Sequence, residues 1–340
     1  MTEMNTGPRL LPWHEDAAAQ LRQAWATNRL PHALLLQGAE GVGKRAFAAW
    51  AACAVLCESP DRRELDCCGS CGSCLLFKAG SHPDLLWVAP EEEKQQISVD
   101  QVRAATERLT KTSYRQGYKV AIVEPAHLMT PNAANSLLKT LEEPSARTLL
   151  ILVTSQPSAL LPTVRSRCQK LTIARPSREA AAAWLQKESG HAVDPALLEF
   201  AGGAPLRALR YADGKFDALN DHMQKSLSAL LGGQADVTQV AAEWEKDALP
   251  ERLTWLDLWL SSLARAALAG NADLVTFPGQ SRHLPSPAHT LNISGVYSLV
   301  DRARALKAQL ARTALQRELA VESWLLALVE VLAPAAPNAR

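Results

Sequence analysis

The chain is predicted to fold as an α/β domain built on a parallel sheet, followed by a region made of helices alone. Three observations carry this prediction. Short apolar runs alternate with helical patterns through about residue 170, a glycine-rich loop lies between the first run and its helix, and helical patterns dominate after Pro176. Strands that alternate with helices are typical of a parallel sheet covered on both faces.

The expected elements follow from apolar runs and from helix-start signals. A helix should extend from Arg45 to about Cys57, and another should begin at Pro131, because Thr130 is a good N-cap and proline fits the first helical position. Apolar strands are expected at 32–37, 119–124 and 148–154. The later helices are expected at 177–187, 195–200 and 205–211, and then from about residue 213 to Leu332.

The charge balance argues against a protein that holds DNA by itself. Lys and Arg number 36 against 35 for Asp and Glu, a formal net charge of +1, whereas such proteins usually show a basic excess. No apolar run approaches the roughly 20 residues of a membrane span, and residues 1–16 carry no signal pattern. We therefore expect a cytoplasmic protein whose contact with nucleic acid is local or shared with partners.

Residues 38–44 have the G-x-x-x-x-G-K spacing of a phosphate-binding loop, with Gly38, Gly41, Gly43 and Lys44 as the candidate nucleotide-binding residues. In such loops the backbone amides and the lysine hold the phosphates, and a Ser or Thr after the lysine is a ligand of magnesium. Here that residue is Arg45, which has no acceptor atom. The loop therefore has the frame for a nucleotide but lacks one group that hydrolysis needs.

The strand at 119–124 carries a second defect at the same chemical step. An ATPase needs Asp-Glu at its end, where the Asp organises magnesium and the Glu positions the attacking water. This strand ends in Glu124 and Pro125. Glu124 keeps a carboxylate, but Pro125 can neither accept a proton nor orient water. The sequence therefore predicts a chain that does not turn over ATP, and it leaves ATP or ADP binding open.

Four of the seven cysteines fall between Cys67 and Cys74. In a reducing compartment such crowding indicates a metal site rather than disulfides. Cys68, Cys71 and Cys74, with Cys57 upstream, offer four thiolates for a tetrahedral site, and zinc bound by four thiolates is structural because no position is left open. Cys67 is an alternative to Cys57, although neighbouring residues rarely both reach one metal. A loop with free thiols is the non-functional alternative.

Arg167, in the triplet Ser166-Arg167-Cys168, follows the third predicted strand. An arginine at this place in a phosphate-loop fold can reach the nucleotide of a neighbouring subunit and stabilise the charge on the transferring phosphoryl group. Its planar fork of donors suits phosphate oxygens better than a lysine does. The alternative is an ordinary surface arginine.

With these features together, the chain resembles the delta-prime subunits of bacterial DNA polymerase III clamp loaders over nearly its whole length. The run Leu-Leu-Lys-Thr-Leu-Glu-Glu-Pro at 137–144 is specific to clamp-loader subunits, and the tau/gamma motor subunits share it. Arg45 and Pro125 separate the two types of subunit. A motor subunit has Thr in place of Arg45, and Asp-Glu in place of Glu124-Pro125. Other matching segments are 31–35, 38–44, the cysteines, His82-Pro83-Asp84, 135–136 and 166–168.

The resemblance implies three domains. A RecA-like AAA+ domain would occupy 1–170 and carry the zinc module at about 57–74, a small helical lid would occupy 171–212, and a helical collar at 213–335 would assemble the complex. It implies that Arg167 is the arginine finger inserted into the ATP site of the neighbouring motor subunit. Thr154 matches the sensor strand, and Arg207 matches the sensor arginine of the lid.

The resemblance also implies a role as a non-hydrolysing stator, against which ATP-driven subunits open the sliding clamp and place it on primed DNA. The implied partners are the tau/gamma and delta subunits, with the clamp and primed DNA reached through the complex and no membrane. The chain would work within the polymerase III holoenzyme, a DNA-directed DNA polymerase and so a nucleotidyltransferase, without ATPase activity of its own. The alternatives are an autonomous P-loop ATPase that uses Glu124, and a zinc-dependent nucleic-acid-binding module, which the near-neutral charge disfavours.

Overall fold

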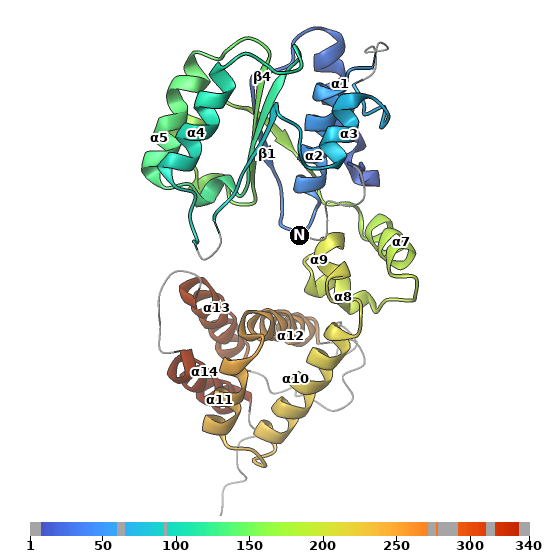
Figure 1. Ribbon diagram of the computed structural model, residues 1–340. Coiled ribbons are helices and arrows are strands. Elements are labelled where there is room, and N and C mark those ends of the chain that lie inside the picture. The colour runs from blue at the N-terminus through green and yellow to red at the C-terminus, as the bar shows by residue number, and fades with distance from the viewer. Residues whose placement is uncertain are drawn as a thin grey trace, which may run out of the picture. The chain divides into compact units, whose positions relative to one another are not determined.

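The computed structural model describes residues 8–59, 65–91, 94–270, 277, 292–310 and 317–332. They belong to two compact units, 1–176 and 177–340 (Figure 1). The last residues of the predicted collar, 333–335, lie outside the described part. Within the described ranges, no helix is both long and apolar enough to cross a membrane.

The first unit is built on a five-stranded sheet in the order β2-β3-β4-β1-β5, and every pairing is parallel. The strands are β1 (Ala33–Gln37), β2 (Leu85–Val88), β3 (Lys119–Val123), β4 (Thr148–Thr154) and β5 (Gln169–Thr172). Helices cover both faces, with α4 and α5 on one face and α1, α2 and α3 on the other (Figure 1). Their bounds are α1 (Glu15–Ala26), α2 (Lys44–Leu56), α3 (Gly72–Lys78), α4 (Val99–Thr110), α5 (Pro131–Glu142) and α6 (Pro162–Arg165).

The three strands predicted from apolar runs are confirmed as β1, β3 and β4, which are central in the sheet and almost entirely buried. The predicted start of α5 is also confirmed. Thr130 is its N-cap, and its hydroxyl accepts a hydrogen bond from the amide of Ala133 at 3.2 Å. These elements were predictable because burial on both faces produces a continuous apolar run and because capping is a local interaction.

The structure adds elements that the apolar runs did not indicate. Strands β2 and β5 have four residues each, and only one residue of β5 is buried, so their patterns are too short to recognise. Because β5 pairs with β1, the first unit extends to Pro176 rather than ending at the predicted residue 170. Helix α4 does carry a local signal, since Ser98 and Gln101 form a capping box at its start.

The sheet order brings the predicted nucleotide-site residues to one edge. Strand β4 lies between β3 and β1, and all three run in the same direction. The glycine-rich loop follows β1, Glu124 follows β3, and Thr154 is the last residue of β4. The carboxyl ends of three neighbouring strands therefore carry the loop, the carboxylate and the hydroxyl, which is the usual place for a ligand in a parallel sheet.

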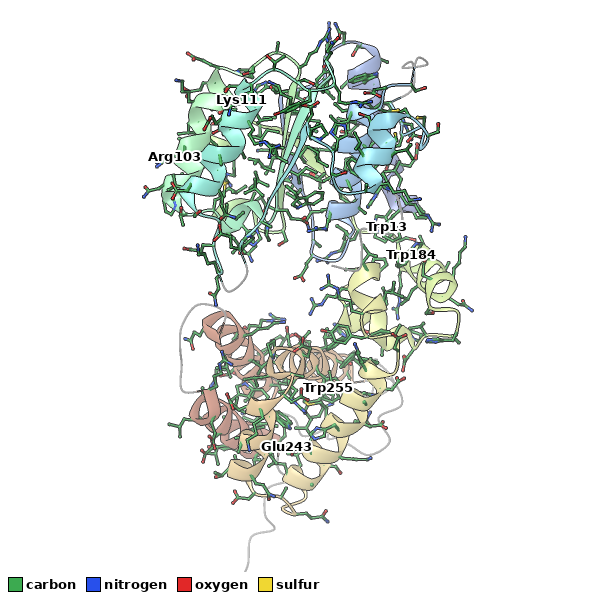
Figure 2. The ribbon with its side chains drawn as sticks, viewed as in Figure 1. Trp13, Arg103, Lys111, Trp184, Glu243 and Trp255 are labelled. Atoms are coloured by element: carbon green, nitrogen blue, oxygen red, sulfur yellow. The ribbon has the colours of Figure 1, made fainter. Side chains whose placement is uncertain are left out.

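The second unit consists of helices in its described part. They are α7 (Arg178–Ser189), α8 (Pro195–Phe200), α9 (Pro205–Leu209), α10 (Lys215–Leu231), α11 (Val237–Lys246), α12 (Leu249–Ala269), α13 (Ile293–Leu310) and α14 (Arg317–Leu332). Four tryptophans lie in its core, each at most 2 % exposed: Trp244, Trp255, Trp259 and Trp324. Figure 2 shows Trp255 among these helices. A boundary between lid and collar near residue 212 stays a prediction.

Candidate functional site

The phosphate-loop residues lie together between β1 and α2, as predicted. Gly43 is the N-cap of α2 and has a left-handed backbone with φ of 84°. Gly38 passes close to another part of the chain, since a Cβ there would lie 2.5 Å from the carbonyl oxygen of Ile173. Lys44 is buried, and its Nζ donates to the Ala39 carbonyl at 2.6 Å. Burial lowers the pKa of Lys44, while the charges of Glu124 and Glu40 oppose that shift.

A short segment near the N-terminus holds the loop in this conformation. The 3-10 helix η2 (Pro12–His14) places two donors on the Val42 carbonyl, Trp13 Nε1 at 2.9 Å and His14 Nε2 at 3.0 Å. The amide of Leu11 donates to His14 Nδ1 at 3.2 Å, so the ring proton lies on Nε2. Burial lowers the pKa of His14 and favours this neutral form. No local sequence pattern predicts this contact, because the segment and the loop are joined only by tertiary packing.

A substitution at Gly43 tests this packing. We expect Gly43→Ala to lower the free energy of unfolding by about 1–3 kcal/mol. The added Cβ would lie 2.5 Å from Leu11 Cδ1 and 2.9 Å from His14 Nε2, on a backbone with positive φ. Denaturant unfolding measures the change. The matched control is Gly80→Ala, where φ is +69° and nothing lies within 4 Å of the new Cβ; equal losses in both variants would contradict the packing explanation.

Arg45 pairs with the carboxylate that follows β3. Its Nη1 lies 2.9 Å from Glu124 Oε2, and the two residues are 79 positions apart in the sequence. The guanidinium also stacks over the Trp87 ring of β2, with Cζ 4.4 Å from the ring centroid. The arginine that replaces the magnesium-binding hydroxyl therefore also occupies the one carboxylate that this strand end offers. The defect at Arg45 and the remaining carboxylate of Glu124 are both evident in the sequence, but the ion pair that joins them is not.

The hydroxyl of Thr154 is engaged by the chain's own groups. It accepts from the amide of Gln156 at 3.0 Å and lies 3.1 Å from His127 Nδ1. This contact places the His127 ring at the same strand ends, where the sequence did not predict it. Burial, and then the positive charge of Lys44, lower the pKa of His127. Arg207 lies on α9 of the second unit, and its role at the loop stays a prediction.

Arg167 lies at the surface just after α6. Val164 and Cys168 on either side are buried in the core next to the sheet, and this anchoring leaves the residues between them outside. The Arg167 side chain is 37 % exposed; its Nη2 lies 2.7 Å from Glu142 Oε1 at the end of α5, and Nη1 donates to the Thr163 carbonyl at 3.0 Å. Two of the matched motifs, 137–144 and 166–168, therefore meet in space, and the guanidinium is accessible.

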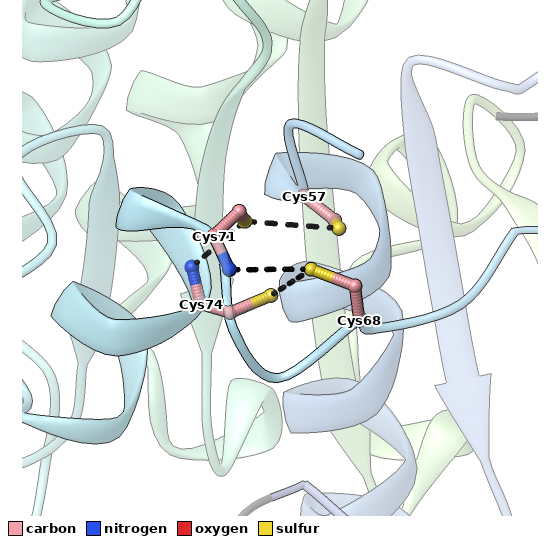
Figure 3. A group of neighbouring side chains, drawn as sticks. All are labelled: Cys57, Cys68, Cys71 and Cys74. Atoms are coloured by element: carbon pink, nitrogen blue, oxygen red, sulfur yellow. Dashed lines mark hydrogen bonds between the residues drawn. The ribbon is translucent and has the colours of Figure 1, made fainter. Parts of the chain in front are cut away.

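Four cysteines form a candidate metal centre in the first unit. Cys57 follows α2, Cys71 is the N-cap of α3, Cys74 lies in its first turn, and Cys68 lies in the loop before it. Their Sγ atoms all lie within 4.8 Å of one another and converge on one point (Figure 3). The amides of Cys71 and Cys74 donate to the sulfurs of Cys68 and Cys71 at 3.3 and 3.4 Å. Such bonds stabilise the thiolate charge that a metal ligand needs.

The spacing of the sulfur atoms fits zinc. A tetrahedral site with Zn–S bonds of about 2.3 Å has sulfur atoms about 3.8 Å apart. The Sγ atoms of Cys57 and Cys71, and those of Cys68 and Cys74, are each 3.9 Å apart. Cys67 does not belong to this group, because its sulfur points to the Trp50 carbonyl at 3.7 Å. The structure thus favours Cys57 over Cys67 as the fourth candidate ligand.

The chain also matches known proteins. Residues 13–177 match the family described as DNA polymerase III, delta subunit, and residues 216–330 match the family of its C-terminal part. The chain is 36% identical over 263 residues to the DNA polymerase III subunit delta' of Pseudomonas aeruginosa, covering 76% of this chain and 78% of that protein. It is 33% identical over 330 residues to subunit delta' of Escherichia coli, covering 96% and 97%.

A more distant match is the subunit gamma/tau of Mycobacterium bovis, 30% identical over 235 residues that cover 66% of this chain and 40% of that protein. This match agrees with the motif at 137–144 that the two subunit types share. The relatives that are similar over most of the chain are named subunit delta'. In this chain Arg45 stands where a motor subunit has its magnesium-binding hydroxyl, and it pairs with the carboxylate of Glu124. The chain therefore belongs to the delta-prime family of DNA polymerase III subunits.

Proposed function

We propose that this chain is a non-hydrolysing subunit of the DNA polymerase III clamp loader. It serves as a stator, a rigid part against which the ATP-driven tau/gamma subunits and the delta subunit open the sliding clamp and place it on primed DNA. The first unit supplies the RecA-like AAA+ domain, and the second supplies the lid and the collar. The observation that carries the proposal is the Arg45–Glu124 ion pair within a phosphate loop that is otherwise intact.

This ion pair explains the loss of hydrolysis in physical terms. Magnesium requires oxygen ligands, and the loop offers no hydroxyl after Lys44. The carboxylate of Glu124 is neutralised by a guanidinium at 2.9 Å, whose positive charge also repels a divalent cation. Pro125 provides no base for the attacking water. The metal-binding and water-orienting parts of hydrolysis are therefore both missing.

We further propose that Arg167 completes the ATP site of a neighbouring motor subunit. The support is its accessibility and its position after the sheet of a phosphate-loop domain. In phosphoryl transfer an arginine supplied in trans stabilises the charge on the equatorial oxygens. Its fork of donors, held by Glu142 in the single chain, can exchange one carboxylate for phosphate oxygens of similar geometry.

We assign structural zinc to Cys57, Cys68, Cys71 and Cys74. A set of four thiolates fills the tetrahedral coordination of the ion and leaves no position for water or substrate. When bound, zinc supplies a cross-link between the end of α2 and the start of α3. This cross-link stabilises the connection between the two helices.

The absence of turnover is the direct test of the stator proposal. We expect the purified chain to hydrolyse ATP with Mg²⁺ no faster than a preparation of its Lys44→Ala variant, because Arg45 and Pro125 remove the same step. A coupled assay of ADP release measures the rate. Turnover that depends on Mg²⁺ and disappears in Lys44→Ala would instead support the autonomous ATPase. Titration of both proteins with ADP determines whether the loop binds nucleotide without hydrolysing it.

A further inference from the structure

We propose that the segment His82-Pro83-Asp84 is the outer support of the four-cysteine site. Through Arg115 and Ser73 it holds the two cysteine-bearing segments in the positions that a metal ion needs. This inference rests on the proposal that the cysteines bind a metal. It gives the segment a chemical role, whereas the sequence identified it only as one matching stretch among several.

Asp84 fixes the backbone of a loop that lies next to the cysteine site. Its carboxylate is buried and accepts three hydrogen bonds, from Ser113 Oγ at 2.9 Å and from the amides of Tyr114 and Arg115 at 2.9 and 3.0 Å. Three donors offset the cost of removing the carboxylate from water, and together they hold the loop in one conformation. The position of Arg115 is therefore set by Asp84.

Arg115 connects the loop to both sides of the cysteine cluster. Its Nε and Nη2 lie 2.6 and 2.8 Å from the two carboxylate oxygens of Glu58, the residue after Cys57. The amide of Glu58 in turn donates to the Cys71 sulfur at 3.5 Å. A Cβ added at Gly72 would lie 2.5 Å from Arg115 Nη2. The guanidinium therefore packs against the first residue of α3 while its two-point contact holds the segment that carries Cys57.

His82 supports the other cysteine-bearing segment. Its Nδ1 accepts from the amide of Asp84 at 3.1 Å, so its Nε2 carries the proton and donates to Ser73 Oγ at 2.7 Å. Both side chains are buried, and Ser73 precedes Cys74 in the first turn of α3. The histidine is therefore not a metal ligand. It fixes the helix turn from which Cys74 projects.

These contacts are made to residues beside the ligands, and they orient the backbone from which the sulfurs project. Loss of such outer partners typically lowers metal affinity by about 10–100-fold. The reason is that the sulfurs of the metal-free chain then sample positions that do not fit the ion. The bidentate Arg115–Glu58 contact is the most accessible part of this support, so it can be changed with the least damage to the core.

The test measures metal affinity in the full chain. Wild type, Arg115→Met and Arg115→Lys are loaded with Co²⁺ and with Zn²⁺, and each ion is withdrawn by a competing chelator. We expect Arg115→Met to bind both ions about 10–100-fold more weakly. Arg115→Lys, which keeps the charge but not the fork, should recover part of the affinity. The matched control is Arg103→Met, which removes an exposed arginine on α4 and should leave affinity unchanged.

The absorption of bound Co²⁺ separates a positioning role from a lost ligand. If Arg115 is a positioning residue, Arg115→Met keeps the spectrum of a four-thiolate site, and only the affinity falls. Glu58→Gln provides a second route to the same loss of affinity should Arg115→Met fail to fold. Equal affinities for wild type, Arg115→Met and Glu58→Gln would overturn the inference. A wild-type chain that binds neither ion would overturn the metal proposal itself, which is a distinct result.

Discussion

Replacing Arg167 with alanine is expected to slow ATP hydrolysis at the neighbouring motor site by about 10³–10⁵-fold in a clamp loader reconstituted from motor, delta and delta-prime subunits. The guanidinium is exposed beside α6, and no buried contact is lost when it is removed, so the complex should still assemble. Turnover is measured with clamp and primed DNA present. Because Arg167 reaches only one ATP site of the complex, the total hydrolysis rate should fall by the contribution of that site alone.

Two control variants separate this role from a structural one. Arg165→Ala removes the half-buried arginine at the end of α6, two residues before Arg167. The Nη1 of Arg165 lies 3.4 Å from the Pro157 carbonyl, and its loss should leave the ATPase rate intact. Arg167→Lys keeps the charge but loses the planar fork, and it should recover only part of the rate. An unchanged rate in Arg167→Ala, with the complex intact by size-exclusion chromatography, would reduce the residue to a surface arginine paired with Glu142.

Replacing Cys68 with serine is expected to abolish stable metal binding. Structural zinc sites bind with about 10–16 kcal/mol of apparent free energy, which is also folding free energy for the segment around them. Cys68 is exposed, so the substitution removes one sulfur ligand without opening a cavity in the core. The metal content per chain and the thermal unfolding midpoint, before and after dialysis against a chelator, measure the effect.

The neighbouring Cys67 is the matched control for this experiment. Its sulfur points to the Trp50 carbonyl, and Cys67 is not one of the four cysteines whose sulfurs lie within 4.8 Å of one another, so Cys67→Ser should retain the metal of the wild type. A chelator should lower the unfolding midpoint of wild type and Cys67→Ser but not that of Cys68→Ser, which has no metal to lose. Equal metal content in the two variants would remove Cys68 from the set of ligands.

Features set by short-range interactions could be predicted from the sequence. The buried strands β1, β3 and β4 appear as continuous apolar runs, and the starts of α5, α7 and α8 follow from Thr130, Ser177 and Asp194, whose side chains cap the amides two or three residues on. The spacing of the glycine-rich loop and of Cys68, Cys71 and Cys74 is equally local. In each case the groups that determine the structure are close together in the chain.

The sequence by itself thus determined the parallel sheet, the phosphate loop, the defects at Arg45 and Pro125 and the group of cysteines. Only the tertiary structure decided how these parts meet. It paired Arg45 with Glu124, placed His14 on the loop, and excluded Cys67 from the metal group. The partners in the first two contacts are 79 and 28 residues apart. Their meeting depends on the order of strands in the sheet and on packing between elements, which no local pattern of residues encodes.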